Sequence, residues 1–90
     1  MVLRVPLSQR ARRFGYIFWP QAMDEEVERF FGVLKTVEVV FENSYLGEKR
    51  IDRAYRRISV GWRQTRRLPR EVSTFRLSFK KDGKLYIACE

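Results

Sequence analysis

The residues of this chain that could do chemistry are its arginines, and most of them lie in one stretch. Residues 49–70 contain nine Lys or Arg residues and a single acid, Asp52. Arg presents a planar, bidentate guanidinium that fits phosphate oxygens and base edges and stacks on rings. Tyr55 and Trp62 lie in the same stretch. Cations with interleaved rings are typical of a surface that neutralises phosphates and stacks bases.

We therefore predict a nucleic-acid-binding site, for DNA or RNA, in an Arg-rich strand and the loop that follows it at residues 63–71. If residues 53–63 form a strand, Arg53, Tyr55, Arg57 and Arg63 share one of its faces. The predicted binding residues are Arg53, Tyr55, Arg56, Arg57, Trp62, Arg63, Arg66, Arg67 and Arg70, with Arg12 and Arg13 ahead of the first predicted strand. The alternative is a solvated outer face, on which Arg stems cover the edge of the core.

The types of residue that are missing restrict catalysis. Histidine is absent and Cys89 is the single cysteine, so we expect no metal site and no cofactor. No phosphate-binding glycine loop and no nucleophile elbow is present. We expect a binding protein without catalytic residues. One enzymatic alternative stays open, a small ribonuclease of the RelE toxin type that works through electrostatics, with Arg53, Tyr55, Arg57 and Arg63 as its candidate residues.

The composition indicates one small, strongly basic domain spanning residues 1–90. The net charge is +8, the isoelectric point is near 10.3, and hydrophobic residues make up 44% of the chain. A single cysteine gives no internal disulfide, and we see neither a secretory signal nor an apolar run long enough to cross a membrane. These features predict a cytoplasmic protein. An Arg-biased genome or a thermophilic surface could also account for the charge.

Charge is unevenly distributed, which leaves an interaction module open as a third reading. Residues 21–48 contain seven acids against Arg29 and Lys35. This acidic segment could meet the basic stretch of a second copy, as in a homodimer or a charge-driven assembly. It could equally be balanced within one chain.

The clearest predicted element is an amphipathic helix over about residues 21–31. Met23, Val27, Phe30 and Phe31 fall on one helical face. Acids near its start suit the helix dipole, and Gly32 is a plausible stop. The strand expected at residues 14–19 ends at Pro20, and the first 12 residues are expected to be loosely ordered.

The remaining elements are read from alternation. Residues 36–42 predict a strand with Val37, Val39 and Phe41 inward, and residues 43–48 predict a turn or loop. Residues 49–62 end in a strand that places Ile58, Val60 and Trp62 on one face. Residues 50–57 could instead contain a helical turn with an Asp52–Arg56 pair. Core positions are expected for Phe30, Phe31, Phe41, Phe75 and Phe79, core or rim positions for Trp19 and Trp62, and a buried site for Cys89.

Residues 72–90 predict a β-hairpin. A three-residue loop, Lys81-Asp82-Gly83, places Gly83 in the left-handed conformation. This register pairs Phe79 with Leu85, Leu77 with Ile87 and Phe75 with Cys89 on one face. The resulting fold class is α+β, with a mostly antiparallel sheet of four to five strands, one amphipathic helix and a C-terminal hairpin.

One segment resembles a known family. Gly15-Tyr16-Ile17-Phe18-Trp19-Pro20, the helix ending at Gly32, and Val37-Glu38-Val39 are similar to the opening strand, helix and second strand of the AbrB/SpoVT swapped-hairpin DNA-binding domain. The helix is about a turn longer, and the Gly-Asp that precedes the second strand in that family is missing. The resemblance implies a dimeric transcription regulator or antitoxin that contacts DNA through Arg12 and Arg13.

Overall fold

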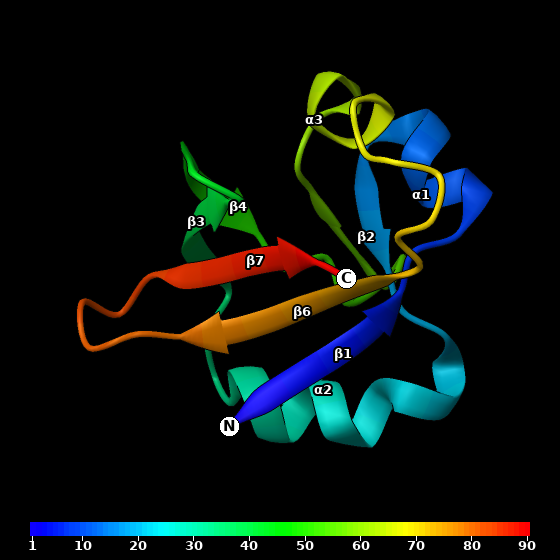
Figure 1. The fold of residues 1–90 in the computed structure, drawn as a ribbon. Helices are drawn as coiled ribbons and strands as arrows, with labels where there is room; N and C mark the ends of the chain where they lie inside the picture. The colour runs from blue at the N-terminus through cyan, green and yellow to red at the C-terminus, as the bar shows by residue number, and fades with distance from the viewer.

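A computed structural model describes all residues, 1–90, and shows an α+β domain built on two sheets (Figure 1). The elements in chain order are β1 (Val2–Pro6), α1 (Gln9–Phe14), β2 (Tyr16–Phe18), the short 3-10 turn η1 (Gln21–Met23), α2 (Asp24–Phe31), β3 (Thr36–Phe41), β4 (Ser44–Arg50), β5 (Arg57–Ser59), α3 (Trp62–Arg66), β6 (Thr74–Phe79) and β7 (Leu85–Cys89). No helix is both long and apolar enough to cross a membrane.

The larger sheet has five strands in the order β1-β6-β7-β3-β4. All neighbouring pairs are antiparallel except β3 and β7, which run parallel, so the sheet is mixed. A parallel pair needs a long crossover, and here the crossover contains β4, β5, α3 and β6. The smaller sheet is the antiparallel pair β2–β5.

The hairpin register is confirmed. Phe79 pairs with Leu85, Leu77 with Ile87 and Phe75 with Cys89. Gly83 has a φ of 80°, as a left-handed loop position requires. The backbone N–H of Lys84 donates to Asp82 Oδ1 at 2.9 Å, which closes the loop.

The amphipathic helix is confirmed in part, as α2 over Asp24–Phe31, while Gln21–Met23 form the 3-10 turn η1 instead. Its Val27, Phe30 and Phe31 are buried, and Met23 packs at the margin of the core. Gly32 ends the helix with a φ of 59°. The inward positions of β3 are as expected, because Val37, Val39 and Phe41 are all buried.

Several local expectations were wrong. Residues 2–6 are not loose but form β1, in which buried Leu3 and Val5 alternate with exposed residues and pair with β6. Residues 43–48 are not a loop, since most of them belong to β4, which follows β3 through the turn Glu42-Asn43. Residues 53–56 form a turn, and residues 62–66 form α3. The expectation of one helix is corrected to three because α1 and α3, two short helices, support each other by packing.

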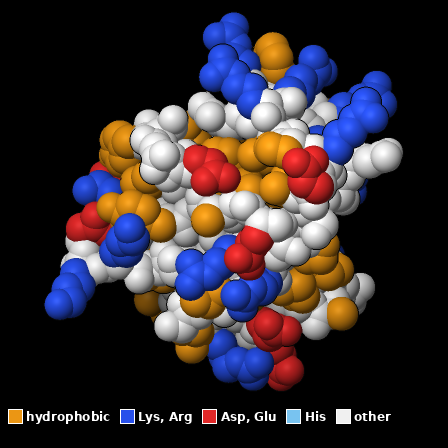
Figure 2. Space-filling view, viewed as in Figure 1, with side chains coloured by type: hydrophobic (Ala, Val, Ile, Leu, Met, Phe, Trp, Pro, Cys, Tyr) orange, Lys and Arg blue, Asp and Glu red, His pale blue; other side chains and the backbone are white.

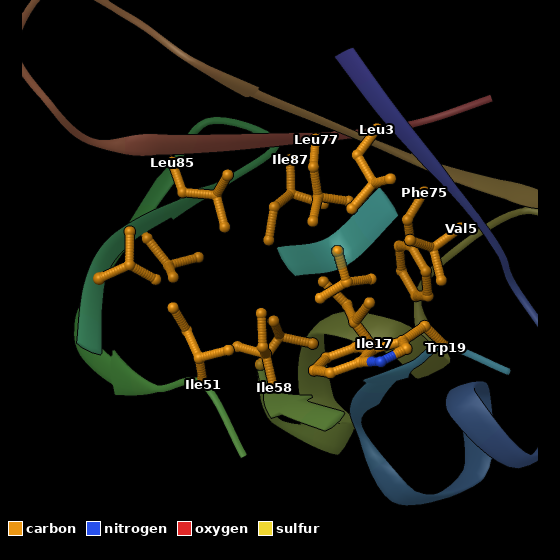
Figure 3. Close-up of a cluster of buried hydrophobic side chains, with 14 of the residues drawn as sticks. Leu3, Val5, Ile17, Trp19, Ile51, Ile58, Phe75, Leu77, Leu85 and Ile87 are labelled. Atoms are coloured by element: carbon orange, nitrogen blue, oxygen red, sulfur yellow. The ribbon is translucent and has the colours of Figure 1, made fainter. Parts of the chain in front are cut away.

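The core lies between the two sheets, with α2 covering one end (Figure 1). In the close-up, Ile17 of β2 and Ile58 of β5 point toward Leu77 and Ile87 of the large sheet (Figure 3). Phe30, Phe31, Phe41 and Phe75 are buried as expected, while Phe79 is half-buried and stacks on Phe30 with ring centroids 5.1 Å apart. One cluster contains all 19 buried hydrophobic residues, so the chain has a single core.

Candidate nucleic-acid interface

Two short helices, α1 and α3, form the platform of the candidate site. Ser8 caps α1 by accepting a hydrogen bond from the N–H of Ala11, and Gly15 ends it in the left-handed conformation. The Gly15 carbonyl then accepts hydrogen bonds from the N–H groups of Val60 and Gly61, both at 2.9 Å. The end of α1 is thereby attached to the start of α3.

Gly15 is required there because the two backbones nearly touch. A Cβ atom at this position would lie 2.1 Å from the backbone nitrogen of Trp62 and 2.3 Å from the carbonyl carbon of Gly61. Only glycine fits at such an approach. The contact determines how closely α1 and α3 pack.

Buried polar groups hold the same helix pair together. Thr65 of α3 is fully buried, and its hydroxyl donates to the backbone carbonyl of Arg12 at 2.7 Å. The Arg12 guanidinium donates to the carbonyls of Leu68, Pro69 and Val72 at 2.9, 2.9 and 2.6 Å. Arg12 therefore holds the loop after α3 against α1, and its η nitrogens are already hydrogen-bonded within the protein.

Apart from Arg10, whose guanidinium carbon lies 4.4 Å from the centre of the Phe18 ring, five exposed arginines remain on this platform without any ion pair. We call these five residues and the two helices the α1–α3 surface: Arg13 on α1, Arg63 and Arg66 on α3, and Arg67 and Arg70 in the segment that follows α3. Lys and Arg side chains project from the end of the molecule where α1 and α3 lie, at the top of the view (Figure 2). Excess positive charge is concentrated at this end of the domain.

The α1–α3 surface contains two open hollows that meet at Arg66. One, of about 360 Å³, is lined by Gln9, Arg12, Arg13, Thr65, Arg66, Leu68 and Arg70. The other, of about 350 Å³, is lined by Trp62, Arg63, Arg66 and Arg67. No acidic side chain lines either hollow, so both would attract anions such as phosphate.

Trp62 stands in the second hollow with about half of its surface exposed, at 49%. The guanidinium carbons of Arg66 and Arg63 lie 4.8 and 5.5 Å from the centre of its ring. These cation–π contacts hold the ring and the two cations together. The prediction that Trp62 shares a strand face with Ile58 and Val60 was wrong, because α3 begins at this residue and turns its side chain out of the core.

Two other predicted binding residues, Arg53 and Arg56, already form hydrogen bonds and ion pairs within the chain. Arg53 donates to Glu28 Oε1 at 2.6 Å and to the carbonyls of Leu34 and Gly32 at 2.7 and 2.9 Å, so it caps the C-terminal end of α2. Arg56 forms a bidentate pair with Asp24, with its closest contact at 2.9 Å. This hydrogen-bonded pair lowers the pKa of the Asp24 carboxyl.

The remaining predicted residues, Tyr55 and Arg57, lie beside β2. The Arg57 guanidinium sits between two rings, 4.5 Å from the centre of Tyr16 and 4.9 Å from that of Tyr55. Arg57 also pairs with Asp52 at 3.4 Å, whereas the helical alternative for residues 50–57 would have paired Asp52 with Arg56. The prediction that Arg53, Tyr55, Arg57 and Arg63 share a strand face was wrong, because residues 53–56 turn and Arg63 belongs to α3.

The structure thus brings together one part of the predicted set, comprising Arg13, Trp62, Arg63, Arg66, Arg67 and Arg70. Sequence reasoning missed Arg10, Phe14, Tyr16 and Phe18, which lie at exposed or half-exposed positions next to this set. The alternation of Phe14, Tyr16 and Phe18 with Gly15 and Ile17 is a usable signal, but residues 14–19 are apolar on both faces, which favours a well-buried strand and hides it.

The structure brings together no three His, Cys, Asp or Glu side chains that could hold a metal ion. Comparison with protein-family models, with curated proteins and with solved structures gives no match. Function is therefore argued from the geometry of this chain.

Proposed function

We propose that this protein is a non-enzymatic nucleic-acid-binding protein and that the α1–α3 surface is its binding site. The observation that carries the proposal is the set of five exposed arginines with no acidic partner. They lie on two helices, whose spacing is fixed by Gly15 and Thr65, and in the segment that directly follows α3. Because the packed helix pair fixes the backbone that carries Arg13, Arg63 and Arg66, little backbone order has to be created there when the guanidinium groups meet a chain of phosphates.

Charge pairing elsewhere in the chain supports this choice of surface. Asp24 and Glu28 of the acidic helix pair with Arg56 and Arg53 of the same chain. Arg53 and Arg56 are thereby neutralised, while the arginines of the α1–α3 surface are not. This arrangement favours an external polyanion over a charge-driven assembly of copies through these paired groups.

The mechanism is phosphate neutralisation with release of counterions. If each of the five arginines engages one phosphate, log K falls with log salt at a slope of about −3.5 on single strands and about −4.5 on duplex DNA. Trp62, between Arg63 and Arg66, is placed to contact the bound chain at the same time.

Fluorescence anisotropy with labelled duplex DNA, single-stranded DNA and single-stranded RNA over a range of salt concentrations tests the proposal. The double variant Arg63→Ala/Arg66→Ala should reduce the magnitude of the slope by about 1.4 to 1.8. The matched control is Arg29→Ala/Arg50→Ala, which removes the same charge from exposed, unpaired positions on α2 and β4. Equal effects of the two double variants would contradict a defined site.

A second readout locates the ligand. Trp19 is 5% exposed and Trp62 49% exposed, so a ligand on the α1–α3 surface should change the emission of Trp62 alone. The change should disappear in Trp62→Phe. A gel of the same samples shows whether the nucleic acid stays intact, and cleaved RNA would support the ribonuclease alternative instead.

A further inference from the structure

The outer face of the β2–β5 pair carries a row of flat side chains, which are half-buried at Tyr16, Phe18 and Arg57 and exposed at Tyr55 and Arg10. Tyr16 and Phe18 point outward from β2 because Ile17 between them is fully buried, and Arg57 lies opposite Phe18 on β5. The row runs Tyr55, Arg57, Tyr16, Phe18, Arg10, with successive separations of 4.9, 4.5, 5.4 and 4.4 Å between ring centres and guanidinium carbons. We call it the aromatic–arginine row.

We propose that the nucleic acid is single-stranded and that its unpaired bases stack on the aromatic–arginine row while its phosphates follow the α1–α3 surface. This inference rests on the proposed function and adds the class of ligand. Unpaired bases are the shared chemistry of single-stranded DNA and RNA, and both fit the row in the same way.

Exposure is the first argument. Tyr55 is 69% exposed, and its ring contacts one cation, the guanidinium of Arg57. Tyr16, Phe18 and Arg57 are half-buried, and their outer surfaces face solvent above a core filled by Ile17 and Ile58. A base that stacks on an exposed ring contributes more binding free energy than an exposed cation–π contact does. Bases can therefore add to the row while the contacts between its rings and guanidinium groups stay in place.

Continuity with the α1–α3 surface is the second argument. Gly15 lies directly before Tyr16, and its backbone touches the backbone of Trp62 at the start of α3. Arg10, at one end of the row, belongs to α1, the helix that also carries Arg13. One strand of nucleic acid can therefore contact the rings of the aromatic–arginine row and the unpaired arginines of the α1–α3 surface, because the two surfaces adjoin.

The third argument excludes a duplex from this row. Bases in a duplex are stacked on one another and present only their edges, so ring faces on a protein cannot reach them without unpairing. Helices of six and five residues are also under two turns long and present little of the surface with which a recognition helix reads the major groove. Stacking tolerates every base, so we expect little sequence preference.

The experiment measures anisotropy with oligomers of about 12 nucleotides, a length within the usual site size of single-strand binders. The probes are oligothymidylate, oligouridylate, an abasic oligomer of equal phosphate number, and a duplex of the same length. We expect the two oligomers with bases to bind at least tenfold more tightly than the abasic one. Tyr55→Ala should lose about tenfold on those oligomers and nothing on the abasic oligomer, and Tyr16→Leu/Tyr55→Ala should lose more.

The matched control is Tyr45→Ala, since Tyr45 is 58% exposed on β4, outside the row. Tyr55 lies in an exposed turn, so its variant should fold even if the Tyr16 variant does not. Equal affinity for abasic and base-containing oligomers, or tighter binding of the duplex, overturns the single-strand inference and leaves the proposed function standing. No binding of any probe at low salt overturns both.

Discussion

Replacing Gly15 by alanine tests the geometry on which the candidate site depends. Gly15 has φ 74° and ψ 36°, a left-handed conformation that disfavours any side chain. Its added Cβ would lie 2.1 Å from the backbone nitrogen of Trp62 and 2.6 Å from the Cα of the same residue. Because both contacts are backbone atoms, no side-chain rotation relieves them, and α1 has to move away from α3.

The magnitude follows from two contributions. The left-handed backbone costs an L-residue about 1–2 kcal/mol. Overpacking against fixed neighbours costs about 1–3 kcal/mol more. Gly15→Ala should therefore lower the free energy of unfolding by about 2–5 kcal/mol, a large share of the roughly 5–13 kcal/mol expected for a domain of this size.

Urea denaturation followed by circular dichroism measures the loss. The matched control is Gly83→Ala, since Gly83 has a similar φ of 80° but no atom within 4 Å of its added Cβ. It should lose only about 1–2 kcal/mol. Equal losses for the two variants would refute the close approach, and with it the argument that α1 and α3 form one rigid platform.

Three further predictions concern single groups. Thr65→Val should lower the free energy of unfolding by about 1–3 kcal/mol, since it leaves the buried Arg12 carbonyl without its donor; the exposed change Thr36→Val should alter it by less than about 0.5 kcal/mol, and equal effects would contradict the bond. The pKa of Asp24 is lowered from its usual 3.8 by its hydrogen bond to Arg56, so the stability contributed by this pair is present above about pH 4 and lost as pH falls through the lowered pKa. Melting temperatures between about pH 2 and 5 should therefore fall less steeply for Asp24→Asn than for the unchanged protein, and parallel curves would show that the pair contributes nothing. Burial raises the pKa of the Cys89 thiol to about 12, so little of it is thiolate at about pH 8. The folded protein should therefore react with a thiol reagent at least tenfold more slowly than the urea-unfolded chain. Equal rates would contradict this burial.

The arginines of this chain serve two separate purposes, which their type and spacing do not distinguish. Arg12, Arg53 and Arg56 donate to carbonyls or carboxylates of the same chain and hold elements together. Arg63 and Arg66 project into solvent around Trp62. The net charge of +8 therefore overstates the number of cations free to bind a ligand.

The sequence by itself determined the features that depend on near neighbours. The helix near residues 21–31 follows from the spacing of its apolar residues and from Gly32, and the hairpin register follows from alternation around Gly83. The inward face of β3 follows in the same way. In each case one short segment contains both the pattern and the turn residue that ends it.

Only the tertiary structure decided the rest, because the deciding contacts join distant parts of the chain. β1 is a strand because β6, some 70 residues later, offers it an edge, and its own five residues carry too weak a pattern to show this. Trp62 is exposed because Gly15 packs against the backbone at the start of α3. Which arginines remain free depends on which carboxylates and carbonyls folding brings within hydrogen-bond reach. Local sequence patterns do not show how close two distant parts of the chain will lie.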